Sequence, residues 1–327
     1  MERTHAEFAI IGAGAIGSIL GAHLARAGRD VLMIARGERA AHIERAGLQV
    51  RGLAQFSQTV GVLADPTRLR SAETLVIATK TYSTAEALRH VRQARVGLAF
   101  SIQNGLLKNE QLAEVWGKER VLGALADTSG ELTPAGEVLF TRNERLLVGE
   151  LSGAASARAA RLAEVIDRAG VRAAAVEDIG SFEWSKFAAW TGLMVLSIAT
   201  RAPTWQYLSD GDAARVLARL VREVGTLASA SGISLCDRAP LPVATIVRGS
   251  EDDAVAAIQA AGEKFKTHAR EHKMSSLQDL EAGRRLEVEE TLGHAVRLAA
   301  QARLALPVLE SSYRIASSID RIARSRA

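Results

Sequence analysis

The sequence predicts an α/β protein in which an N-terminal Rossmann domain, a doubly wound parallel sheet, is followed by a C-terminal all-α domain. Nearly all-apolar runs at residues 6–12, 30–35, 74–79 and 96–103 alternate with helical patterns such as 15–27 and 83–91. Buried parallel strands alternate with their crossover helices in this way. A glycine-rich turn directly follows the first run, and beyond residue 178 the apolar spacing becomes helical.

The length supports two domains, because 327 residues exceed what one hydrophobic core holds comfortably. We expect the first domain to span residues 1–178 and the second 179–327, with the active site in the cleft between them. Short apolar runs at 121–126, 138–140 and 171–176 are expected to extend the parallel sheet. The helical half is punctuated by Pro203, Pro240, Pro242 and Pro307.

Composition indicates a globular cytoplasmic protein. Lys and Arg are scattered, the net charge is only +4 and aromatic residues make up 4% of the chain, so nucleic acid is not an expected partner. The longest apolar run, residues 187–199, is shorter than the roughly 20 residues that cross a bilayer, and the charged N-terminus does not look like a signal peptide. The single cysteine, Cys236, excludes an internal disulfide and fits a reducing compartment. The terminal RIARSRA, residues 321–327, is expected to be a frayed basic tail.

The first apolar run continues into IIGAGAIGSILG, a G-x-G-x-x-G pattern between a strand and a helix. Its glycines permit a tight turn, a close approach to a pyrophosphate and close helix packing, while the helix N-terminus attracts the phosphates. This context predicts dinucleotide binding. The residues expected at the cofactor are Gly12, Ala13, Gly14, Ala15, Ile16 and Gly17.

The end of the second strand predicts which dinucleotide binds. NAD sites usually place an acidic residue there for the ribose hydroxyls, whereas this chain has Arg36 and Arg39 with Glu38 between them. A guanidinium pairs well with a 2′-phosphate. Arg36 could also be an ordinary surface residue, but its position favours NADP(H) as the cofactor.

Two polar residues follow further strands at the edge where open sheets bind ligands. Lys80 comes after LVIAT, and Asn104 comes after AFSIQ. Both have ordinary alternatives, since Asn-Gly is a turn dipeptide and a lysine can simply end a strand. Lys186 also has two interpretations, because it lies within the apolar stretch WSKFAAWTGLM. It either extends its amine from a packed helix into water or sits in a dry cleft to do chemistry.

Six blocks follow one another in a familiar order: GAGAIGS at 12–18, ARGE at 35–38, TKTYST at 79–84, IQNG at 102–105, EWSKF at 183–187 and SSLQDLEAGRRLEVE at 275–289. With these blocks the chain resembles the ketopantoate reductase family (2-dehydropantoate 2-reductases, the PanE/ApbA group) over nearly its whole length. The last two blocks are the specific ones, because many dehydrogenases share the glycine loop. The resemblance implies an NADPH-dependent reductase of pantothenate biosynthesis.

The resemblance also implies roles for single residues. Lys186 aligns with the catalytic lysine that gives a proton to the ketone oxygen, Asn104 with an asparagine that contacts cofactor and substrate, and Glu287 with a glutamate near the nicotinamide ribose and the lysine. Hydride transfer leaves an alkoxide that needs a proton donor, and a carboxylate such as Glu287 would keep a lysine charged. By alignment, Lys80 binds the cofactor and Ser275 the substrate. Ser129 falls near another cofactor contact, beside a local length difference.

The chain departs from the family at three substrate-binding asparagines. Trp190 and Met194 replace two of them, at i+4 and i+8 from Lys186 on one helix face, and Thr204 replaces the third. One interpretation is core packing, and the other is a pocket for a substrate larger and less polar than ketopantoate. Arg201 on the same stretch could hold a carboxylate or simply end a helix.

We therefore expect reduction of a small-molecule 2-oxo acid, with 2-dehydropantoate as the default substrate. The alternatives are a bulkier, less polar keto substrate or a catalytically silent NADP-binding sensor. His268 and His272 have metal-like spacing, but no third ligand is evident and no metal is expected. A homodimer is compatible with the sequence, which identifies neither the true substrate nor the physiological direction.

Overall fold

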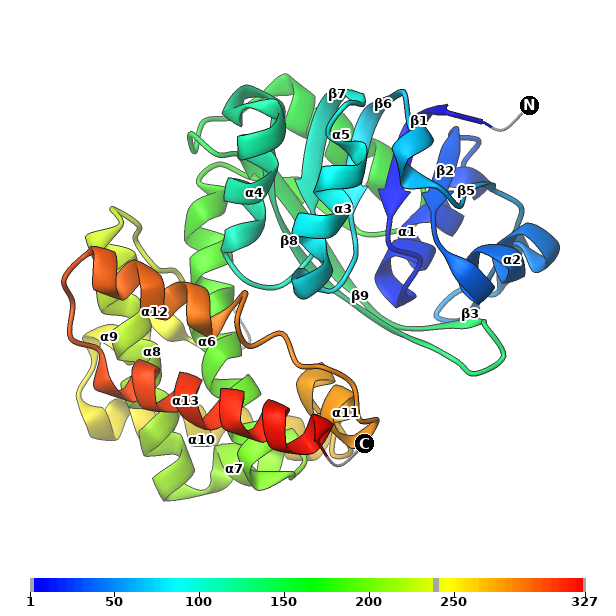
Figure 1. Ribbon diagram of the computed structural model, residues 1–327. Helices are drawn as coiled ribbons and strands as arrows, with labels where there is room; N and C mark the ends of the chain where they lie inside the picture. The colour runs from blue at the N-terminus through cyan, green and yellow to red at the C-terminus, as the bar shows by residue number, and fades with distance from the viewer. Residues whose placement is uncertain (1–2, 238–240, 326–327) are drawn as a thin grey trace. The chain divides into compact units, whose positions relative to one another are not determined.

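The computed structural model describes residues 3–237 and 241–325 and separates into two units, Met1–Gly180 and Ser181–Ala327. Their boundary lies two residues beyond the expected position 178. In the described residues all the strands belong to the first unit, where helices accompany them, and the second unit has helices alone (Figure 1). The predicted fold class is confirmed.

Five strands of the first unit form a fully parallel sheet in the order β5-β2-β1-β6-β7. The order reverses between β1 and β6, and ligands of open α/β sheets bind at such a switch point. The strands are β1 (His5–Ile11), β2 (Val31–Ile34), β5 (Gly61–Leu63), β6 (Ser71–Ile77) and β7 (Arg95–Ser101). The helices around them are α1 (Ala15–Arg26), α2 (Gly37–Ala46), α3 (Thr84–Val91) and α4 (Leu107–Trp116), with short 3₁₀ turns η1 (Pro66–Arg68), η2 (Thr81–Ser83) and η3 (Lys118–Arg120).

A second, mixed sheet completes this unit, and it corrects one prediction. The runs expected to extend the parallel sheet belong to β8 (Leu122–Leu132), β9 (Val138–Glu150) and β10 (Ala173–Ala175). β8 and β9 are antiparallel, and β9 also pairs with β10 and β3 (Leu48–Gly52), which continues to β4 (Phe56–Gln58). In the described part of the chain, a single isolated β-bridge, from Ala99 to Val121, joins β7 to the residue just before β8. Apolar runs predict strands but not their partners. The antiparallel pairing of β8 with β9, for example, depends on the turn at residues 133–137 that connects them.

Alternation along the strands produces two separate cores in this unit. Ile10 of β1 points to the same core as Ile19 of α1 and Phe140 of β9, so α1 packs between the two sheets. Ile11, the next residue of β1, joins Leu112 and Trp116 of α4 on the other face. The parallel strands are therefore buried on both faces, which explains their continuous apolar runs. The helix α5 (Ala157–Arg168) packs against β9 and β10.

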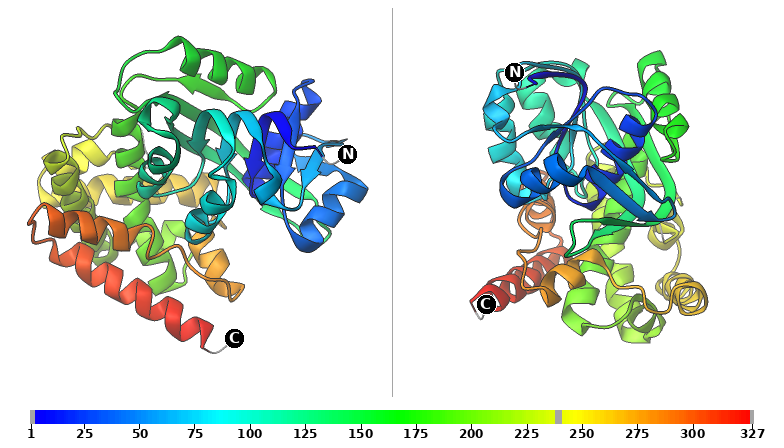
Figure 2. Two further views of the ribbon diagram at one scale, coloured as in Figure 1. Left: turned by 45° about the horizontal axis from the view of Figure 1, so that its top comes forward. Right: turned by 90° about the vertical axis from the view of Figure 1, so that its right-hand side faces the viewer.

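The second unit is entirely helical in its described residues (Figure 2). Its helices are α6 (Ile179–Thr200), which begins in the first unit, α7 (Thr204–Ser209), α8 (Gly211–Ala230), α9 (Val243–Arg248), α10 (Glu251–His268), α11 (Ser275–Glu281), α12 (Leu292–Gln301) and α13 (Pro307–Arg324). The prolines mark helix starts as expected: Pro203 and Pro242 are N-caps, and Pro307 is the first residue of α13. Pro240 lies outside the described residues.

The C-terminus differs from the expected frayed tail. Residues 321–324 form the last turn of α13, whose basic residues Arg321 and Arg324 lie at the negative end of the helix dipole. Arg324 also pairs with Asp320 at 3.0 Å. Residues 326–327 lie outside the described part of the chain.

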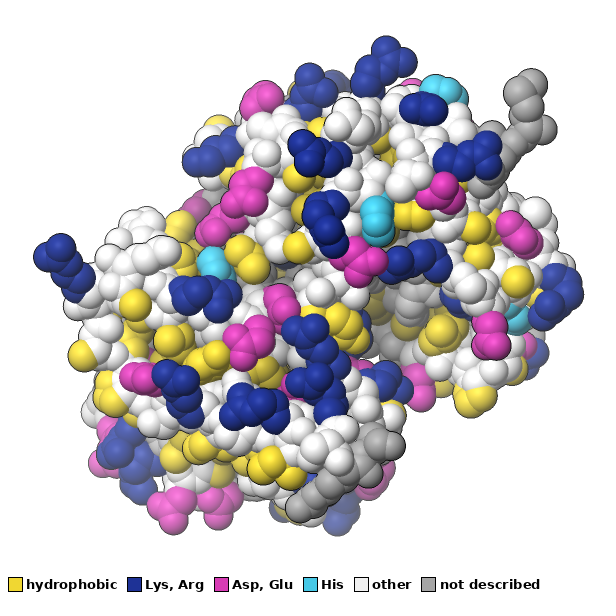
Figure 3. Space-filling model, viewed as in Figure 1, with side chains coloured by type: hydrophobic (Ala, Val, Ile, Leu, Met, Phe, Trp, Pro, Cys, Tyr) yellow, Lys and Arg dark blue, Asp and Glu magenta, His cyan; other side chains and the backbone are white. Residues whose placement is uncertain are grey.

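Charged side chains of both signs are interspersed on the face shown in Figure 3. No large field of a single sign covers that face. Among the described residues, no helix combines the length and the apolar character needed to span a membrane.

Candidate functional site

The turn from β1 into α1 is closed by two glycines that have no room for a side chain. Gly12 has φ +107°, and a Cβ atom there would lie 2.6 Å from the carbonyl carbon of Ala78. At Gly17 it would lie 2.1 Å from the carbonyl oxygen of Gly12. At Gly14 it would meet no heavy atom within 4 Å beyond the chain neighbours. Two glycines thus close the turn, and the third leaves the backbone open to a ligand.

The N-terminus of α1 is suited to an anion. Gly14 is its N-cap, no side chain caps the helix, and its first turn holds no acidic residue. The N–H groups of Ala15, Ile16 and Gly17 therefore have no partner within the helix, and the helix dipole favours negative charge beside them.

Arg39 holds the glycine loop in place through hydrogen bonds. Its Nε donates to the carbonyl of Ala13 at 2.9 Å, one Nη donates to Ser18 Oγ at 2.9 Å, and the other donates to the carbonyl of Gly136 at 2.7 Å. Partial burial lowers the pKa of this guanidinium, which nevertheless stays charged because arginine titrates far above neutral pH. The guanidinium of Arg39 is thus occupied by groups of the protein itself, and it joins the glycine loop to the β8–β9 turn.

Arg36, in contrast, keeps its guanidinium at the surface. It is the N-cap of α2, directly after β2, and its side chain is 62% exposed. Its contact is an ion pair with Glu86 on α3, where Nη1 donates to Oε1 at 3.0 Å. Of the two arginines after β2, only Arg36 has an exposed charge for a phosphate.

Strand register brings the ends of β6 and β7 together, and Lys80 and Asn104 lie shortly beyond these two ends. Ile77 faces Ser101 across β6 and β7, and the two polar residues each follow this pair by three positions. Gln103 ties the segments together, because its Nε2 donates to the carbonyl of Thr79 at 2.7 Å and to Thr84 Oγ1 at 2.7 Å. Gly105 has φ +88°, so Asn104 does belong to a tight turn, and this turn presents it at the sheet edge.

Lys108 is a structural residue that the sequence analysis missed. Its side chain is 5% exposed, and Nζ donates to the carbonyl of Gln103 at 3.1 Å and to that of Ala124 on β8. It therefore connects the Asn104 turn to the second sheet. A lysine in the first turns of a helix with mixed polarity gives no sequence signal of burial.

Ser129 lies on β8 where the strand is irregular. Its pairing with β9 shifts register between Asp127 and Thr128 and again between Ser129 and Gly130, and such bulges re-aim side chains. Gly130 brings β8 against α1, since a Cβ there would lie 2.6 Å from Ile19 Cδ1. A hollow beside this contact has apolar walls and suits no phosphate; its lining is Ile16, Ile19, Leu20, Ile102, Ala126, Thr128, Leu146 and Val171.

The helix α6 carries the expected proton donor and two of the substituted positions. Lys186 is partly exposed, while Trp190 is 7% and Met194 0% exposed. Phe187 stacks on Trp190 with ring centroids 6.5 Å apart. Gly192 gives α6 its close contact with α8, because a Cβ there would lie 2.8 Å from Leu217 Cδ1.

The face of α6 that bears Met194 turns toward the start of α11. Ser197, one turn further on this face, lies 3.2 Å from Ser276, oxygen to oxygen. Ser276 is buried, whereas its neighbour Ser275, the first residue of α11, is exposed. Ser275 is therefore presented to solvent by a helix start that is fixed to α6.

Thr204 forms a hydrogen-bonded junction inside the second unit. The side chain is fully buried, its Oγ1 lies 2.9 Å from His272 Nδ1, and it accepts a hydrogen bond from Tyr207 at 3.2 Å. Burial raises the pKa of Tyr207. His272 therefore already has Thr204 as a hydrogen-bond partner. Among the described residues, no group of three or more His, Cys, Asp or Glu side chains could hold a metal ion. Arg201 is exposed and has φ +55° at the end of α6.

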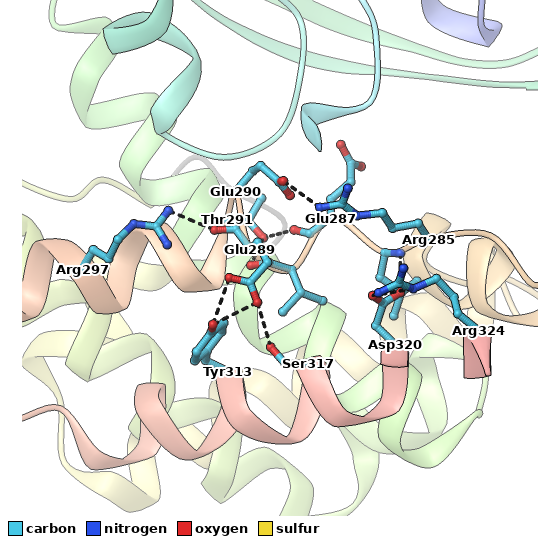
Figure 4. A network of polar contacts seen from close by, with 12 residues as sticks. Arg285, Glu287, Glu289, Glu290, Thr291, Arg297, Tyr313, Ser317, Asp320 and Arg324 are labelled. Carbon is cyan, nitrogen blue, oxygen red and sulfur yellow. Dashed lines mark hydrogen bonds and ion pairs between the residues drawn. The ribbon is translucent and has the colours of Figure 1, made fainter. Parts of the chain in front are cut away.

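Glu287 lies on the irregular segment 285–291, which α13 holds in place (Figure 4). The N–H of Leu286 donates to Asp320 at 2.8 Å, and Tyr313 donates to Glu289 at 2.9 Å. Thr291 Oγ1 donates to the carbonyl of Glu287. Asp320 of α13 thus fixes the backbone just before Glu287, Tyr313 of α13 holds the side chain of Glu289, and the carbonyl of Glu287 is bonded from within the segment.

Two ionisable groups follow Glu287, the half-buried Glu290 and the buried His294. Burial, together with the nearby carboxylates of Glu289 and Glu287, raises the pKa of Glu290, which pairs with Arg285 at 3.0 Å. Burial and the charge of Arg297 lower the pKa of His294 to about 4. His294 is therefore neutral at physiological pH, and the charges around Glu287 are those of carboxylates and arginines.

Comparison with known proteins finds matches along most of the chain. Residues 8–153 match the family described as ketopantoate reductase PanE/ApbA, and residues 178–320 match ketopantoate reductase PanE/ApbA C terminal. The chain is 30% identical to a 2-dehydropantoate 2-reductase of Archaeoglobus fulgidus over 288 residues, 88% of this chain and 89% of that protein.

Solved structures share the same fold. A 2-dehydropantoate 2-reductase from Geobacter metallireducens GS-15 aligns with a TM-score of 0.81 at 25% identity, covering 95% of this chain and 99% of that one. D-mandelate dehydrogenase, in a ternary structure with NADH and anilino(oxo)acetate, aligns with a TM-score of 0.83 at 17% identity, covering 97% and 98%. The second likeness concerns the fold alone.

The glycine geometry predicts different outcomes for two alanine variants. Gly14→Ala should fold with an unchanged melting temperature, because its methyl meets nothing, yet bind dinucleotides about tenfold or more weakly by blocking the backbone approach. Gly17→Ala should also lose stability, by about 1–3 kcal/mol for overpacking. Thermal unfolding and titration with NADPH and NADH measure both. Equal melting of the two variants would contradict the predicted clash at Gly17.

Lys108→Met should destabilise the protein while preserving the packed stem. It leaves two buried carbonyls without this donor, at about 1–3 kcal/mol each, so the melting temperature should fall by several degrees. Lys118→Met, which changes an exposed lysine on η3, is the matched control. If both variants melted like the parent, the two bonds of Lys108 would contribute no net stability.

Proposed function

The chain belongs to the ketopantoate reductase family and is an oxidoreductase of that family; we propose that it reduces a 2-oxo acid with NADPH. The observation that carries the proposal is the switch-point edge of the parallel sheet. The open approach at Gly14, the exposed charge of Arg36 and the strand-end residues Lys80 and Asn104 all stand at that edge. An unrelated dinucleotide-binding protein would need the glycines but not Arg36, Lys80 and Asn104 together with them.

The residues present fit a nicotinamide dinucleotide phosphate. The uncapped N-terminus of α1 suits a pyrophosphate, and Arg36 suits a 2′-phosphate. Lys80, Asn104 and Ser129 would complete the cofactor contacts, with Glu287 at the nicotinamide ribose. When bound, the reduced cofactor supplies a hydride to the carbonyl carbon of the substrate.

Lys186 would supply the proton that the reaction needs. Addition of a hydride to a ketone leaves negative charge on oxygen, and an ammonium within hydrogen-bond reach stabilises that charge and then gives up a proton. Lys186 suits the role because it is a partly exposed residue of α6, one turn after the buried Glu183 and one turn before the buried Trp190. Glu287 would keep the lysine charged, and Ser275 and Asn104 would orient the substrate.

The substituted positions favour a bulkier, less polar 2-oxo acid over 2-dehydropantoate. An indole, a thioether and an engaged hydroxyl occupy the three positions where the family has asparagines. Thr204 already bonds His272 and Tyr207, so it has less to offer a polar substrate. The fold accommodates an aromatic oxo acid elsewhere, since D-mandelate dehydrogenase holds anilino(oxo)acetate.

A substrate panel tests the proposal. Initial rates of NADPH and NADH oxidation would be measured with 2-dehydropantoate and with aliphatic and aromatic 2-oxo acids. We expect turnover with NADPH, faster with the bulkier acids. Tight NADPH binding without turnover of any acid would refute the reductase and support an NADP-binding sensor.

Lys186→Ala should separate chemistry from binding. We expect kcat to fall by about 10²–10⁴, as for a lost general acid, while the Kd of NADPH stays within about twofold. Lys264→Ala removes an exposed lysine on α10 and should leave kcat unchanged. Near-normal turnover of the Lys186 variant would make the residue an ordinary helix lysine.

Restoring asparagine at positions 190 and 194 tests the substrate pocket. If both side chains line it, Trp190→Asn with Met194→Asn should shift kcat/KM toward 2-dehydropantoate by roughly 10²-fold relative to an aromatic acid, since each regained bond contributes about 1–3 kcal/mol. Val195→Asn, at a 5% exposed position on another face of the helix, controls for buried polarity. Lower stability in both variants without a preference shift would place Trp190 and Met194 in the core.

A further inference from the structure

The guanidinium proposed for the 2′-phosphate already has an anionic partner. Nη1 of Arg36 donates to Glu86 Oε1 at 3.0 Å, and the side chains are 62% and 47% exposed. The pair links the N-cap of α2 to the first turn of α3, and both ends belong to the first unit. Unlike Arg39, which is fixed to the backbone, Arg36 is engaged by a charge that a ligand can displace.

Glu86 is the acidic member of a basic neighbourhood. The hydrogen bond and the charge of Arg36, with smaller contributions from His90 and Arg89, hold the pKa of its carboxyl below the usual value. The group is therefore ionised at every pH at which the protein would be assayed near neutrality. A ligand at Arg36 meets a permanent negative charge.

This charge acts differently on the two dinucleotides. A 2′-phosphate needs the guanidinium fork that Glu86 partly occupies, and its own negative charge is repelled by the carboxylate. A 2′-hydroxyl needs neither and can donate a hydrogen bond to a carboxylate. We propose that Glu86 is a specificity-determining residue, which lowers the preference for NADPH over NADH by engaging Arg36; this inference rests on the proposed use of a nicotinamide cofactor.

The sign of the effect makes the inference testable. Removing the charge in Glu86→Gln should tighten NADPH binding by about two- to fivefold, the range expected for an exposed ion pair, and leave the Kd of NADH within twofold. The gain should shrink at high ionic strength, because salt screens exposed charges. In an Arg36→Ala background most of the gain should vanish, since Glu86 acts through the guanidinium.

Titration calorimetry of the full chain with NADPH and NADH would measure these constants, and adenosine 2′,5′-bisphosphate against AMP would localise the effect to the adenosine half. Glu164→Gln is the matched control, because it breaks an exposed Arg–Glu pair with Arg168 in the same unit. Unfolding temperatures within about 2 °C would show that both variants are folded.

Two outcomes would overturn the inference. An unchanged NADPH-to-NADH ratio in Glu86→Gln would show that the carboxylate is irrelevant to selection, and weaker NADPH binding would show that it orders Arg36 for the phosphate. Both leave the proposed reductase standing. If the unmodified chain bound neither dinucleotide, the proposed function itself would fail.

Discussion

Three backbone segments meet where β1 turns into α1, and their approach leaves no space for a Cβ atom. Gly12 contacts the chain after β6, and Gly17 contacts the carbonyl of Gly12. This contact sets the distance between α1 and the sheet, and it brings the helix N-terminus to the edge where β6 and β7 end. The binding edge of the first unit therefore depends on a steric constraint that only glycine satisfies.

Because the groups at this edge are mostly backbone N–H groups and turn residues, side chains elsewhere must hold the backbone still. Arg39 holds the glycine loop, Gln103 joins the ends of β6 and β7, and Lys108 fixes the Asn104 turn to β8. Each uses strong hydrogen bonds to carbonyls. In the second unit, α13 holds the segment around Glu287 through the N–H of Leu286 and the side chain of Glu289. Pre-organisation of this kind reduces the ordering that a ligand must impose.

The sequence predicted the features that depend on local pattern. Apolar runs located β1, β2, β6 and β7, because buried strands need apolar side chains. The glycine pattern located the start of α1, because the tight turn before it needs glycine. The sequence did not predict the second sheet, since strand pairing depends on contacts distant in sequence. It could not separate Arg36 from Arg39 either. Both follow β2 within five residues, and only the fold shows that one guanidinium reaches Ala13 while the other reaches Glu86.

The substituted asparagine positions show how far burial alone constrains chemistry. Met194 is completely buried and Thr204 is satisfied by its own neighbours, so neither offers an unengaged donor to a ligand. This holds whether or not a substrate touches them. These two positions therefore do not help to select a hydroxylated substrate by hydrogen bonds, which give the strongest discrimination. At these two positions selection comes from shape and apolar contact, which distinguish substrates by only about 1–3 kcal/mol per methylene. A chain with this α6 should therefore accept a broader range of 2-oxo acids than one that retains the carboxamides.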